Sequence, residues 1–327
     1  MSRAGLSELR DGAARVRLPE RGVLEVAGSD RARWLDGMLT NAVADLAPDG
    51  ERSGCRALAL TRQGRIVADP HVLARADAFL LELDAAAIPA LALHLDAFLV
   101  ADDVALRDAT ADWVRFAVEG PTAAASWAEA GLPIPTPDGV ARATLADIDV
   151  LAAGYSLSGL GGVQVLAPAA SADAAWEALA TVAAAEAGGD ALELARIEQG
   201  IPRLGAELGT DVLPVEARLE AAISETKGCY TGQEVVARMR SRDRVSHLLV
   251  GFRFESGEPL PVGTELEAEG RRGGEVTSSV RSDRFGPIGL GFVTRALAEP
   301  GTPLAAADRT VRVAALPFAP SPADGAP

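Results

Sequence analysis

The chain has almost no lysine, asparagine or tyrosine, and it has few cysteines and histidines. Its 327 residues contain one Lys, one Asn, two Tyr, two Cys and three His. Two cysteines, Cys55 and Cys229, are too few for a disulfide framework. The histidines His71, His94 and His247 are scattered and show no spacing typical of metal ligands. We therefore expect neither a disulfide-stapled fold nor a bound structural metal.

Basic residues are also in deficit, and long hydrophobic runs are absent. The formal net charge of −15 argues against general nucleic-acid binding, because phosphate binding needs a basic surface. No run reaches the roughly 18 uncharged apolar residues of a membrane span, and segment 1–22 lacks the apolar core of a signal peptide. We expect a cytoplasmic protein with no direct nucleic-acid partner and no membrane association.

What is present is enough apolar material for large cores. With 48% hydrophobic residues, the chain can form two or three domains. Strand-like and helical patterns alternate up to residue 244, which predicts an α+β fold. From Val245 short strand-like runs are separated by Gly and Pro turns, with no helical period between them. We predict domains at 1–244 and 245–318, the second of them all-β, and a disordered tail at 319–327.

Hydrophobic periodicity predicts the elements of the first domain. A strand at 22–27 leads into a helix that Ser29 or Asp30 caps and that carries Trp34 and Leu35 on its apolar side. Further strands are predicted at 55–61, 65–75, 79–83, near 104, at 113–118, 143–151 and 163–166. Further helices are predicted at about 86–98, from Pro121 onward and at about 172–186, with a Gly-rich loop at 154–162.

The rare residue types gather in one segment. Lys227, Cys229 and Tyr230 lie within a single tetrapeptide at the start of the sequence KGCYTGQE. Thr231 and Glu234 have the spacing of a capping box and precede a helical run, so Thr231 is the predicted N-cap. This arrangement places Cys229 just outside the N-terminus of a helix.

A cysteine in that position has the features of a reactive thiol. The positive end of the helix dipole and the ammonium of Lys227 both favour the thiolate of Cys229. Gly228 and Gly232 leave room for a ligand to approach the backbone. The alternative is a buried, inert cysteine, which is the interpretation we give to Cys55 in its apolar strand.

Four arginines follow the motif in an otherwise acidic chain: Arg238, Arg240, Arg242 and Arg244. Guanidinium groups suit planar anions, so this run can bind a carboxylate, a phosphate or a polyglutamate tail. It can equally form a solvated helix face that pairs with neighbouring acids. The sequence leaves both alternatives open.

The stretch KGCYTGQEVVARMRSR resembles the signature of the YgfZ proteins, the folate-binding relatives of the aminomethyltransferase of the glycine cleavage system. Three upstream segments, 26–41, 61–69 and 196–202, resemble further segments of this family in order and spacing. The motif residues that match are Lys227, Gly228, Cys229, Tyr230, Thr231, Gly232, Gln233 and Glu234, with Arg238 downstream.

The resemblance implies an α+β GcvT-like folate-binding fold of two interleaved α+β subdomains plus a C-terminal β-barrel. It implies tetrahydrofolate or a derivative as the cofactor. In this sequence Ala68 precedes Asp69 where the family normally has two adjacent acids, and Gln164 takes the place of an acid. A neutral amide can hydrogen-bond a pterin ring but cannot match the charge of a carboxylate. The implied folate-binding residues are Asn41, Asp69, Tyr155, Gln164, Arg196 and Glu198.

Three functions follow in order of preference. The first is a folate-binding accessory protein that supports iron–sulfur cluster assembly or repair, and through it tRNA modification, with Cys229 and Lys227 as its catalytic residues. Its partners are folate and iron–sulfur proteins or their assembly machinery, because one cysteine cannot itself hold a cluster. The second is a tetrahydrofolate-dependent aminomethyl or methyl transferase, a one-carbon transferase. The third is a structural interaction protein in which Cys229 is inert.

Overall fold

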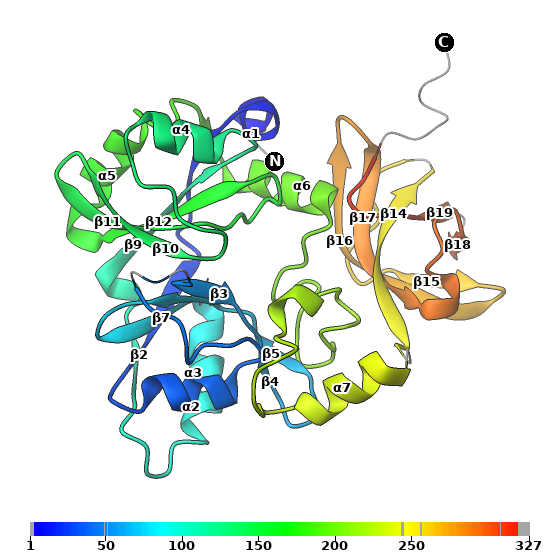
Figure 1. The fold of residues 1–327 in the computed structure, drawn as a ribbon. Coiled ribbons are helices and arrows are strands. Elements are labelled where there is room, and N and C mark those ends of the chain that lie inside the picture. Colours follow the sequence, from blue (N-terminus) through cyan, green and yellow to red (C-terminus); the bar gives the residue numbers. More distant parts are fainter. Residues whose placement is uncertain are drawn as a thin grey trace. The chain divides into compact units, whose positions relative to one another are not determined.

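The computed structural model describes residues 3–48, 50, 52–242, 245–255, 257–307 and 309–319, with the backbone alone at 240–242. The chain divides into two compact units (Figure 1). The first unit contains Met1–Leu192 and Ala221–Gln233, and the second contains Glu193–Glu220 and Glu234–Pro327. No helix of the described residues is long and apolar enough to cross a membrane.

One half of the first unit is an antiparallel sheet covered by two helices. Its strands, in spatial order, are β3 (Gly54–Arg56), β6 (His71–Ala74), β7 (Ala78–Asp84), β2 (Arg21–Ala27) and β8 (Ala105–Asp108). The helices α2 (Arg31–Met38) and α3 (Ile88–Asp96) bury Trp34, Leu35, Leu91 and Leu95 against one face of the sheet. A separate hairpin pairs β4 (Ala59–Leu60) with β5 (Ile66–Ala68).

The other half of the first unit is a six-stranded sheet. Its strands, in spatial order, are β10 (Val140–Leu145), β11 (Ile148–Ala153), β12 (Gly162–Pro168), β9 (Trp113–Glu119), β1 (Ala14–Arg17) and β13 (Glu186–Ala187). The helices α4 (Ala123–Glu129) and α5 (Ala172–Leu179) pack Trp127 and Trp176 into its core, and a short helix α1 (Leu6–Asp11) precedes β1.

The two sheets of the first unit lie face to face between their helices. Val23, Leu73 and Leu80 from the five-stranded sheet share a buried cluster with Val140 and Leu166 from the six-stranded sheet. The layers are therefore helix, sheet, sheet and helix (Figure 1). The chain starts in the six-stranded sheet with β1, builds the five-stranded sheet from β2 to β8, and returns with β9, so the two halves are interleaved as the resemblance implied.

The second unit contains a closed β-barrel. Its strands, in the order in which they close, are β14 (His247–Phe254), β17 (Gly286–Thr294), β16 (Arg271–Ser282), β15 (Glu265–Ala268), β18 (Pro303–Ala306) and β19 (Arg309–Ala314). Phe252, Val276 and Val311 are buried in its interior. Two more helices, α6 (Gly189–Gln199) and α7 (Gln233–Arg242), each begin in the first unit and end in the second.

The barrel strands lie inside the segment 245–318 that the sequence assigned to an all-β domain, whereas the compact unit around them also includes Glu193–Glu220 and α7. The domain boundaries at 244 and 318 stay a prediction. Residues 320–327 of the predicted tail lie outside the described residues.

Four local predictions were wrong. The strand expected at 143–151 is a hairpin, in which Leu145 pairs with Ile148 and the turn residues Ala146 and Asp147 have φ of 48° and 65°. No Gly, Pro or Asn marks this turn and Asp147 is its only typical turn residue, so the hydrophobic pattern predicts one strand. The helix expected at 172–186 ends at Leu179, because the chain must extend to pair β13 with β1.

The third error concerns the start of α2. Asp30 stands at its N-cap position but makes no side-chain capping bond. Its carboxylate accepts the backbone N–H of Asp103 at 2.9 Å, and the Ser29 hydroxyl donates to the Asp103 carboxylate at 2.7 Å. These two residues therefore fasten the loop before β8 to the start of α2. The fourth error is that the runs predicted as single strands at 55–61 and 65–75 each contain two short strands, because β4 and β5 pair with each other outside the five-stranded sheet that holds β3 and β6. The other predicted strands and helices of the first domain are present, with ends displaced by a few residues.

Candidate functional site

The ammonium group of Lys227 is buried against the C-terminal end of α2. Its Nζ donates to the carbonyl oxygens of Leu39 at 2.8 Å, of Asn41 at 2.9 Å and of Asp36. It also lies 3.3 Å from the Asp36 carboxylate, and the side chain is 2% exposed. Burial lowers the pKa of Lys227, and the Asp36 carboxylate opposes that change. Lys227 therefore satisfies carbonyl groups that the helix leaves unbonded at its end.

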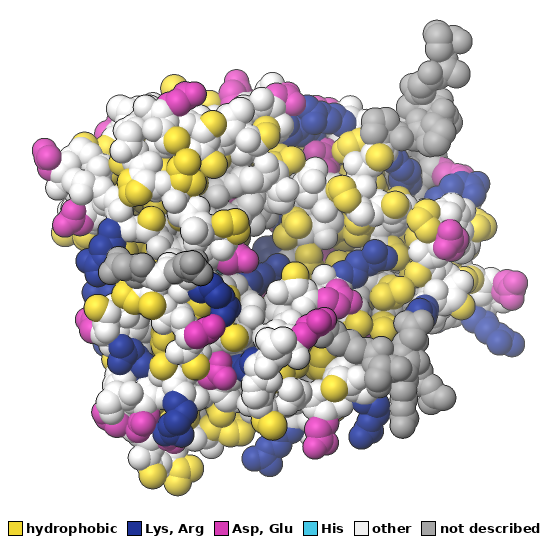
Figure 2. Space-filling view, in the orientation of Figure 1, with side chains coloured by type: hydrophobic (Ala, Val, Ile, Leu, Met, Phe, Trp, Pro, Cys, Tyr) yellow, Lys and Arg dark blue, Asp and Glu magenta, His cyan; other side chains and the backbone are white. Residues whose placement is uncertain are grey.

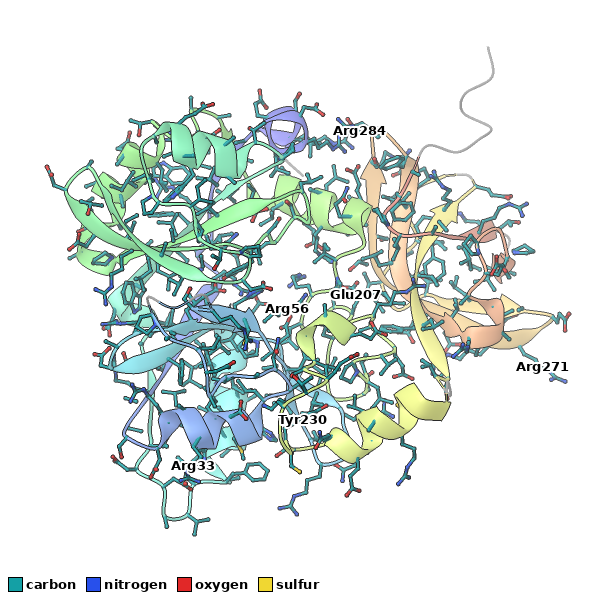
Figure 3. The ribbon with its side chains drawn as sticks, viewed as in Figure 1. Arg33, Arg56, Glu207, Tyr230, Arg271 and Arg284 are labelled. Carbon is teal, nitrogen blue, oxygen red and sulfur yellow. The ribbon has the colours of Figure 1, made fainter. Side chains whose placement is uncertain are left out.

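The segment after Lys227 is fastened to the same helix. Tyr230 is buried, its ring centroid lies 5.6 Å from the Lys227 ammonium, and the Thr231 N–H donates to the Gly37 carbonyl at 3.2 Å (Figure 3). Cys229, between these anchors, is exposed. The structure thus holds an accessible thiol on a segment whose two ends are fixed.

The two glycines of the motif differ in what surrounds them. No atom lies within 4 Å of the position that a Cβ would take at Gly228. At Gly232, φ is 84° and a Cβ would lie 2.7 Å from the Thr61 carbonyl oxygen. Gly232 therefore allows the hairpin between β4 and β5 to approach, and of the two glycines only Gly228 leaves open space for a ligand.

The capping box predicted for Thr231 is wrong. Helix α7 begins at Gln233, so Gly232 directly precedes it, and Glu234 is its second residue. Glu234 and Arg238 are exposed. The side chains of Arg240 and Arg242, and the whole of Arg244, lie outside the described residues, so both interpretations of the arginine run stay open.

Arg56, labelled in Figure 3, links Asn41 and Asp69. The Asn41 side-chain amide donates to the Arg56 carbonyl at 2.9 Å, and its own oxygen accepts the N–H of Ala42. The Arg56 guanidinium forms an ion pair with Asp69 at 2.8 Å, and the Asp69 side chain is 16% exposed. Because Lys227 binds the Asn41 carbonyl, one chain of contacts links Lys227, Asn41, Arg56 and Asp69.

A row of charged side chains crosses the five-stranded sheet next to this chain of contacts. His71 is the cross-strand partner of Arg56 on one side and of Glu82 on the other, so the three side chains share one face. The His71 ring stacks on Tyr155, with ring centroids 3.5 Å apart and planes 6° apart. Burial, and next the charge of Arg56, lower the pKa of His71.

Glu82 is completely buried between two cations. Arg21 donates to its carboxylate at 2.6 and 2.8 Å, Arg115 lies 3.0 Å away, and the Tyr155 hydroxyl also donates to it. Burial raises the pKa of Glu82, but Arg115 and Arg21 lower it by more, so it lies below its ordinary value. Burial and the Glu82 charge raise the pKa of Tyr155. The Tyr155 hydroxyl is thus already bonded.

A second buried acid, Glu119, holds the Gly-rich loop at 154–162. Its carboxylate accepts hydrogen bonds from the hydroxyls of Ser156 at 2.7 Å and Ser158 at 2.6 Å, and from the backbone N–H groups of Leu157 and Ser158. Burial raises the pKa of Glu119 despite these donors. The loop is therefore fixed from inside by one carboxylate.

Gln164 lies beside this acid. Its amide nitrogen donates to Glu119 at 2.6 Å and to the Tyr155 carbonyl at 3.0 Å. Its amide oxygen is buried and has no hydrogen-bond partner among the described residues. The predicted residues Tyr155 and Gln164 are therefore neighbours, and Gln164 carries an unused acceptor.

Arg196 and Glu198 belong to the second unit, where both are buried. Arg196 forms ion pairs with Glu193 and, at 3.0 Å, with Glu207, and it donates to the Ser278 hydroxyl at 2.8 Å. The Ser282 hydroxyl donates to Glu198 at 2.6 Å. Burial lowers the pKa of Arg196 and its carboxylate partners raise it by more. These contacts connect α6 with barrel strand β16.

Sequence reasoning missed Glu82, Arg115 and Glu119. The signal was present in β7, where AFLLELD places an acid in an apolar strand, and in β9, where WVRFAVE contains an arginine and an acid. A charged residue inside such a strand needs a buried partner of opposite charge or several hydrogen bonds. In the described part of the chain, no group of three or more His, Cys, Asp or Glu side chains is arranged to hold a metal ion.

Comparison with known proteins identifies both parts of the chain. Residues 6–227 match the family model described as GCVT N-terminal domain, and residues 248–323 match the glycine cleavage T-protein C-terminal barrel domain. An aminomethyltransferase of Chlorobium chlorochromatii is 30% identical over 315 residues, covering 90% of this chain and 83% of the relative. A chloroplastic protein of Arabidopsis thaliana, named as a transferase, is 28% identical over 302 residues, covering 90% and 68%.

A solved structure has the same fold. The aminomethyltransferase T of the glycine cleavage system from Bartonella henselae aligns with a TM-score of 0.83 at 23% identity, covering 96% of this chain and 88% of that chain. The predicted fold class, an α+β region followed by a β-barrel, is confirmed.

Proposed function

This chain belongs to the family of the GCVT N-terminal domain, and we propose that it is a YgfZ-type protein that binds a reduced folate and presents Cys229 as a reactive thiol. In this proposal it supports iron–sulfur cluster assembly or repair, and through it tRNA modification. Its partners are folate and iron–sulfur proteins or their assembly machinery, and its location is the cytoplasm.

The observation that carries the proposal is the contrast between the two cysteines. Cys55 is buried, and burial raises the pKa of its thiol to about 12. Cys229 is exposed between the anchors provided by Lys227 and Thr231. Since a cluster needs several ligands, an iron–sulfur species would be cargo that Cys229 handles together with ligands from a partner.

The first unit offers groups that fit a folate. The pterin ring carries N–H donors, and the buried amide oxygen of Gln164 is an acceptor without a partner. Asp69 adds a partly exposed carboxylate beside Arg56. Tyr155 can contribute its ring rather than its hydroxyl, which donates to Glu82. A bound tetrahydrofolate would supply the amine that carries a one-carbon unit. Folate contacts of Asn41, Arg196 and Glu198 stay predictions, since contacts within the chain already occupy their polar groups.

Equilibrium binding of tetrahydrofolate and 5-formyltetrahydrofolate, followed for the wild type and for Cys229→Ala and Gln164→Leu, tests the folate site. We expect Cys229→Ala to bind like the wild type and Gln164→Leu to bind about tenfold more weakly, because a buried hydrogen bond is lost. No binding by the wild type would refute folate dependence.

The thiol is tested separately by alkylation over a range of pH. In Cys55→Ala only Cys229 can react, and we expect its thiol to be alkylated in the folded chain because it is exposed. Cys229→Ala, which retains the buried Cys55, is the matched control and should not react. Loss of iron–sulfur enzyme activity in cells that carry Cys229→Ala would link the thiol to its client. An inaccessible thiol without pterin affinity would favour a structural interaction protein.

The relatives named as aminomethyltransferases favour a second candidate, a tetrahydrofolate-dependent aminomethyl or methyl transferase. In that case Asp69 is the carboxylate that orients the folate amine, and its ion pair with Arg56 holds it in place. Turnover of an aminomethyl-loaded carrier protein, abolished in Asp69→Asn but retained in Cys229→Ala, would establish this activity. The opposite pattern would exclude it.

A further inference from the structure

The first unit contains a cavity whose lining residues are not those of the candidate site described above. Its volume is about 520 Å³, within the usual range of small-molecule sites. Its lining combines residues of the six-stranded sheet with Arg75 from the turn between β6 and β7. The lining residues that matter here are Arg75, Trp113, Arg142, Asp149, Leu151 and Pro168.

The sheet register explains why these residues meet. Arg142 on β10 is the cross-strand partner of Leu151 on β11, and Trp113 on β9 is the partner of Pro168 on β12. Arg75 comes from the turn that joins β6 to β7. The cavity is thus built on regular strands and one tight turn, which fix the backbone positions of these residues.

Trp113 provides a flat apolar wall with one polar edge. The Arg75 guanidinium carbon lies 5.8 Å from the centroid of its ring. Within the described residues the indole N–H has no hydrogen-bond acceptor. Leu151 and Pro168 extend the apolar surface. An aromatic ring can stack here while an acceptor group receives the indole hydrogen.

The cations of this cavity lack strong partners. In the described part of the chain the Arg142 guanidinium has no hydrogen bond or ion pair, and Arg75 has only a 3.5 Å contact with the exposed Asp77. By contrast, Arg21 and Arg196 form contacts of 2.5–3.0 Å with buried or partly buried acids. A weak exposed ion pair leaves Arg75 free to exchange its partner.

The charge of the lining favours a monoanion. Two arginines and one aspartate leave one net positive charge, and Asp149 is held by the Thr144 hydroxyl at 3.2 Å. On the face shown in Figure 2, basic side chains lie scattered among acidic ones. Among the residues that the structure describes, neither arginine of this cavity forms a short ion pair with an acid, although the chain has a net charge of −15.

We propose that this cavity binds a small aromatic carboxylate, with the ring stacked on Trp113 and the carboxylate between Arg75 and Arg142. Guanidinium groups bind carboxylates through paired hydrogen bonds and also stack on aromatic faces. The site is independent of the proposed folate and thiol chemistry.

Calorimetric titration of the full chain with benzoate, 2-naphthoate and indole-3-carboxylate tests the proposal. The neutral analogue 2-naphthamide has nearly the same shape and serves as the matched ligand. We expect at least one carboxylate to bind with a Kd below about 1 mM, and 2-naphthamide to bind at least about tenfold more weakly than 2-naphthoate. Equal affinity for the acid and the amide, or no binding by any of the three acids, would overturn the proposal.

Two variants locate the site. Arg142→Gln should weaken 2-naphthoate binding about tenfold and leave 2-naphthamide unchanged, whereas Trp113→Leu should weaken both. Arg271→Gln, which removes an exposed arginine at the edge of the barrel in the second unit (Figure 3), is the control and should bind like the wild type. If Trp113→Leu does not fold, Arg75→Gln replaces it with the same expectation as Arg142→Gln. An Arg142→Gln protein that binds 2-naphthoate as tightly as Arg271→Gln would refute the assignment.

Discussion

Glu82 and Glu119 are both completely buried in the first unit, yet their pKa values move in opposite directions. Glu82 faces two guanidinium groups, and their charges outweigh the effect of burial. Glu119 receives at least five hydrogen bonds, but all come from hydroxyl or amide donors without charge, and burial outweighs them. The charge of the partners, rather than burial or the number of hydrogen bonds, decides which protonation state each acid favours.

Lys227 follows the pattern of Glu119. Carbonyl oxygens make up most of its partners, and one carboxylate, Asp36, adds an opposite charge. Burial lowers the pKa of Lys227, toward the neutral amine. A buried charge held mainly by uncharged dipoles thus shifts toward its neutral form, whether it is an acid or a base.

Removing one of the two cations that face Glu82 should have the largest effect on the free energy of unfolding. Arg115→Met leaves a buried carboxylate with one guanidinium partner, and breaking a buried ion pair in this way destabilises a protein by about 3–5 kcal/mol. Urea unfolding of the full chain, monitored by circular dichroism, measures the change.

The double variant Glu82→Gln with Arg115→Met is the control. It removes the carboxylate that Arg115→Met leaves partly unpaired, so it should recover part of the lost stability. A double variant that is less stable than Arg115→Met would show that the cation is not what stabilises Glu82.

Lys227→Met should have the next largest effect. The substitution keeps the length of the side chain but leaves three carbonyl groups without their donor and removes the ion pair with Asp36, at a cost of about 2–3 kcal/mol. Because the same ammonium anchors the segment that carries Cys229, the alkylation rate of Cys229 should also change. Arg271→Met, at an exposed position, should alter neither the stability nor the alkylation rate. A Lys227→Met protein within about 0.5 kcal/mol of the wild type would show that α2 does not need this cap.

Lys227 also shows which features of the site the sequence could predict and which it could not. Its rarity and its place beside Cys229 drew attention to it, and local spacing suggested that its charge acts on the thiol. Its actual partners, at the end of α2, are nearly two hundred positions away along the chain, 188 in the case of Leu39. Local patterns carry no information about such contacts, because the tertiary fold alone brings the two segments together.

The same limit explains which parts of the fold were predictable. Strands with a clear hydrophobic pattern and the β-rich end of the chain were found from the sequence, and the interleaved arrangement came from the family resemblance. The hairpin at Ala146 and Asp147 was missed, because Asp147 is its only typical turn residue and the apolar pattern continues on both sides of it. Glu82 and Arg115 were missed as a pair because they lie on different sheets and meet only when the two sheets pack face to face.

Replacing Glu119 by Gln should cost less than either change above, about 1 kcal/mol near neutral pH. The glutamine amide keeps one acceptor oxygen, but its NH₂ group takes the place of the second acceptor and faces hydrogen-bond donors. The substitution also removes a charge that burial disfavours. These two effects oppose each other, unlike those at Glu82. Urea unfolding measures the change, with Glu129→Gln on the exposed part of α4 as the control, which should be neutral. A loss as large as that of Arg115→Met would contradict the distinction between the two acids.

The smallest expected effect is the pH dependence of the stability that is lost in Glu82→Gln and in Glu119→Gln. It is also the most direct test of the opposite pKa shifts of the two acids. The pKa of Glu82 is below its ordinary value of 4.5 in the folded chain, so its contribution to stability is present above that pH and is lost as the pH falls further. The pKa of Glu119 is above 4.5, so the folded chain holds its proton more tightly, and its contribution is present below that pH and is lost as the pH rises. Between about pH 3.5 and pH 7, the stability lost in Glu82→Gln should therefore increase with pH, and the loss in Glu119→Gln should decrease. Urea unfolding of both variants and the wild type across this range gives the two slopes. Slopes of the same sign would mean that the partners of the two acids do not set their protonation states.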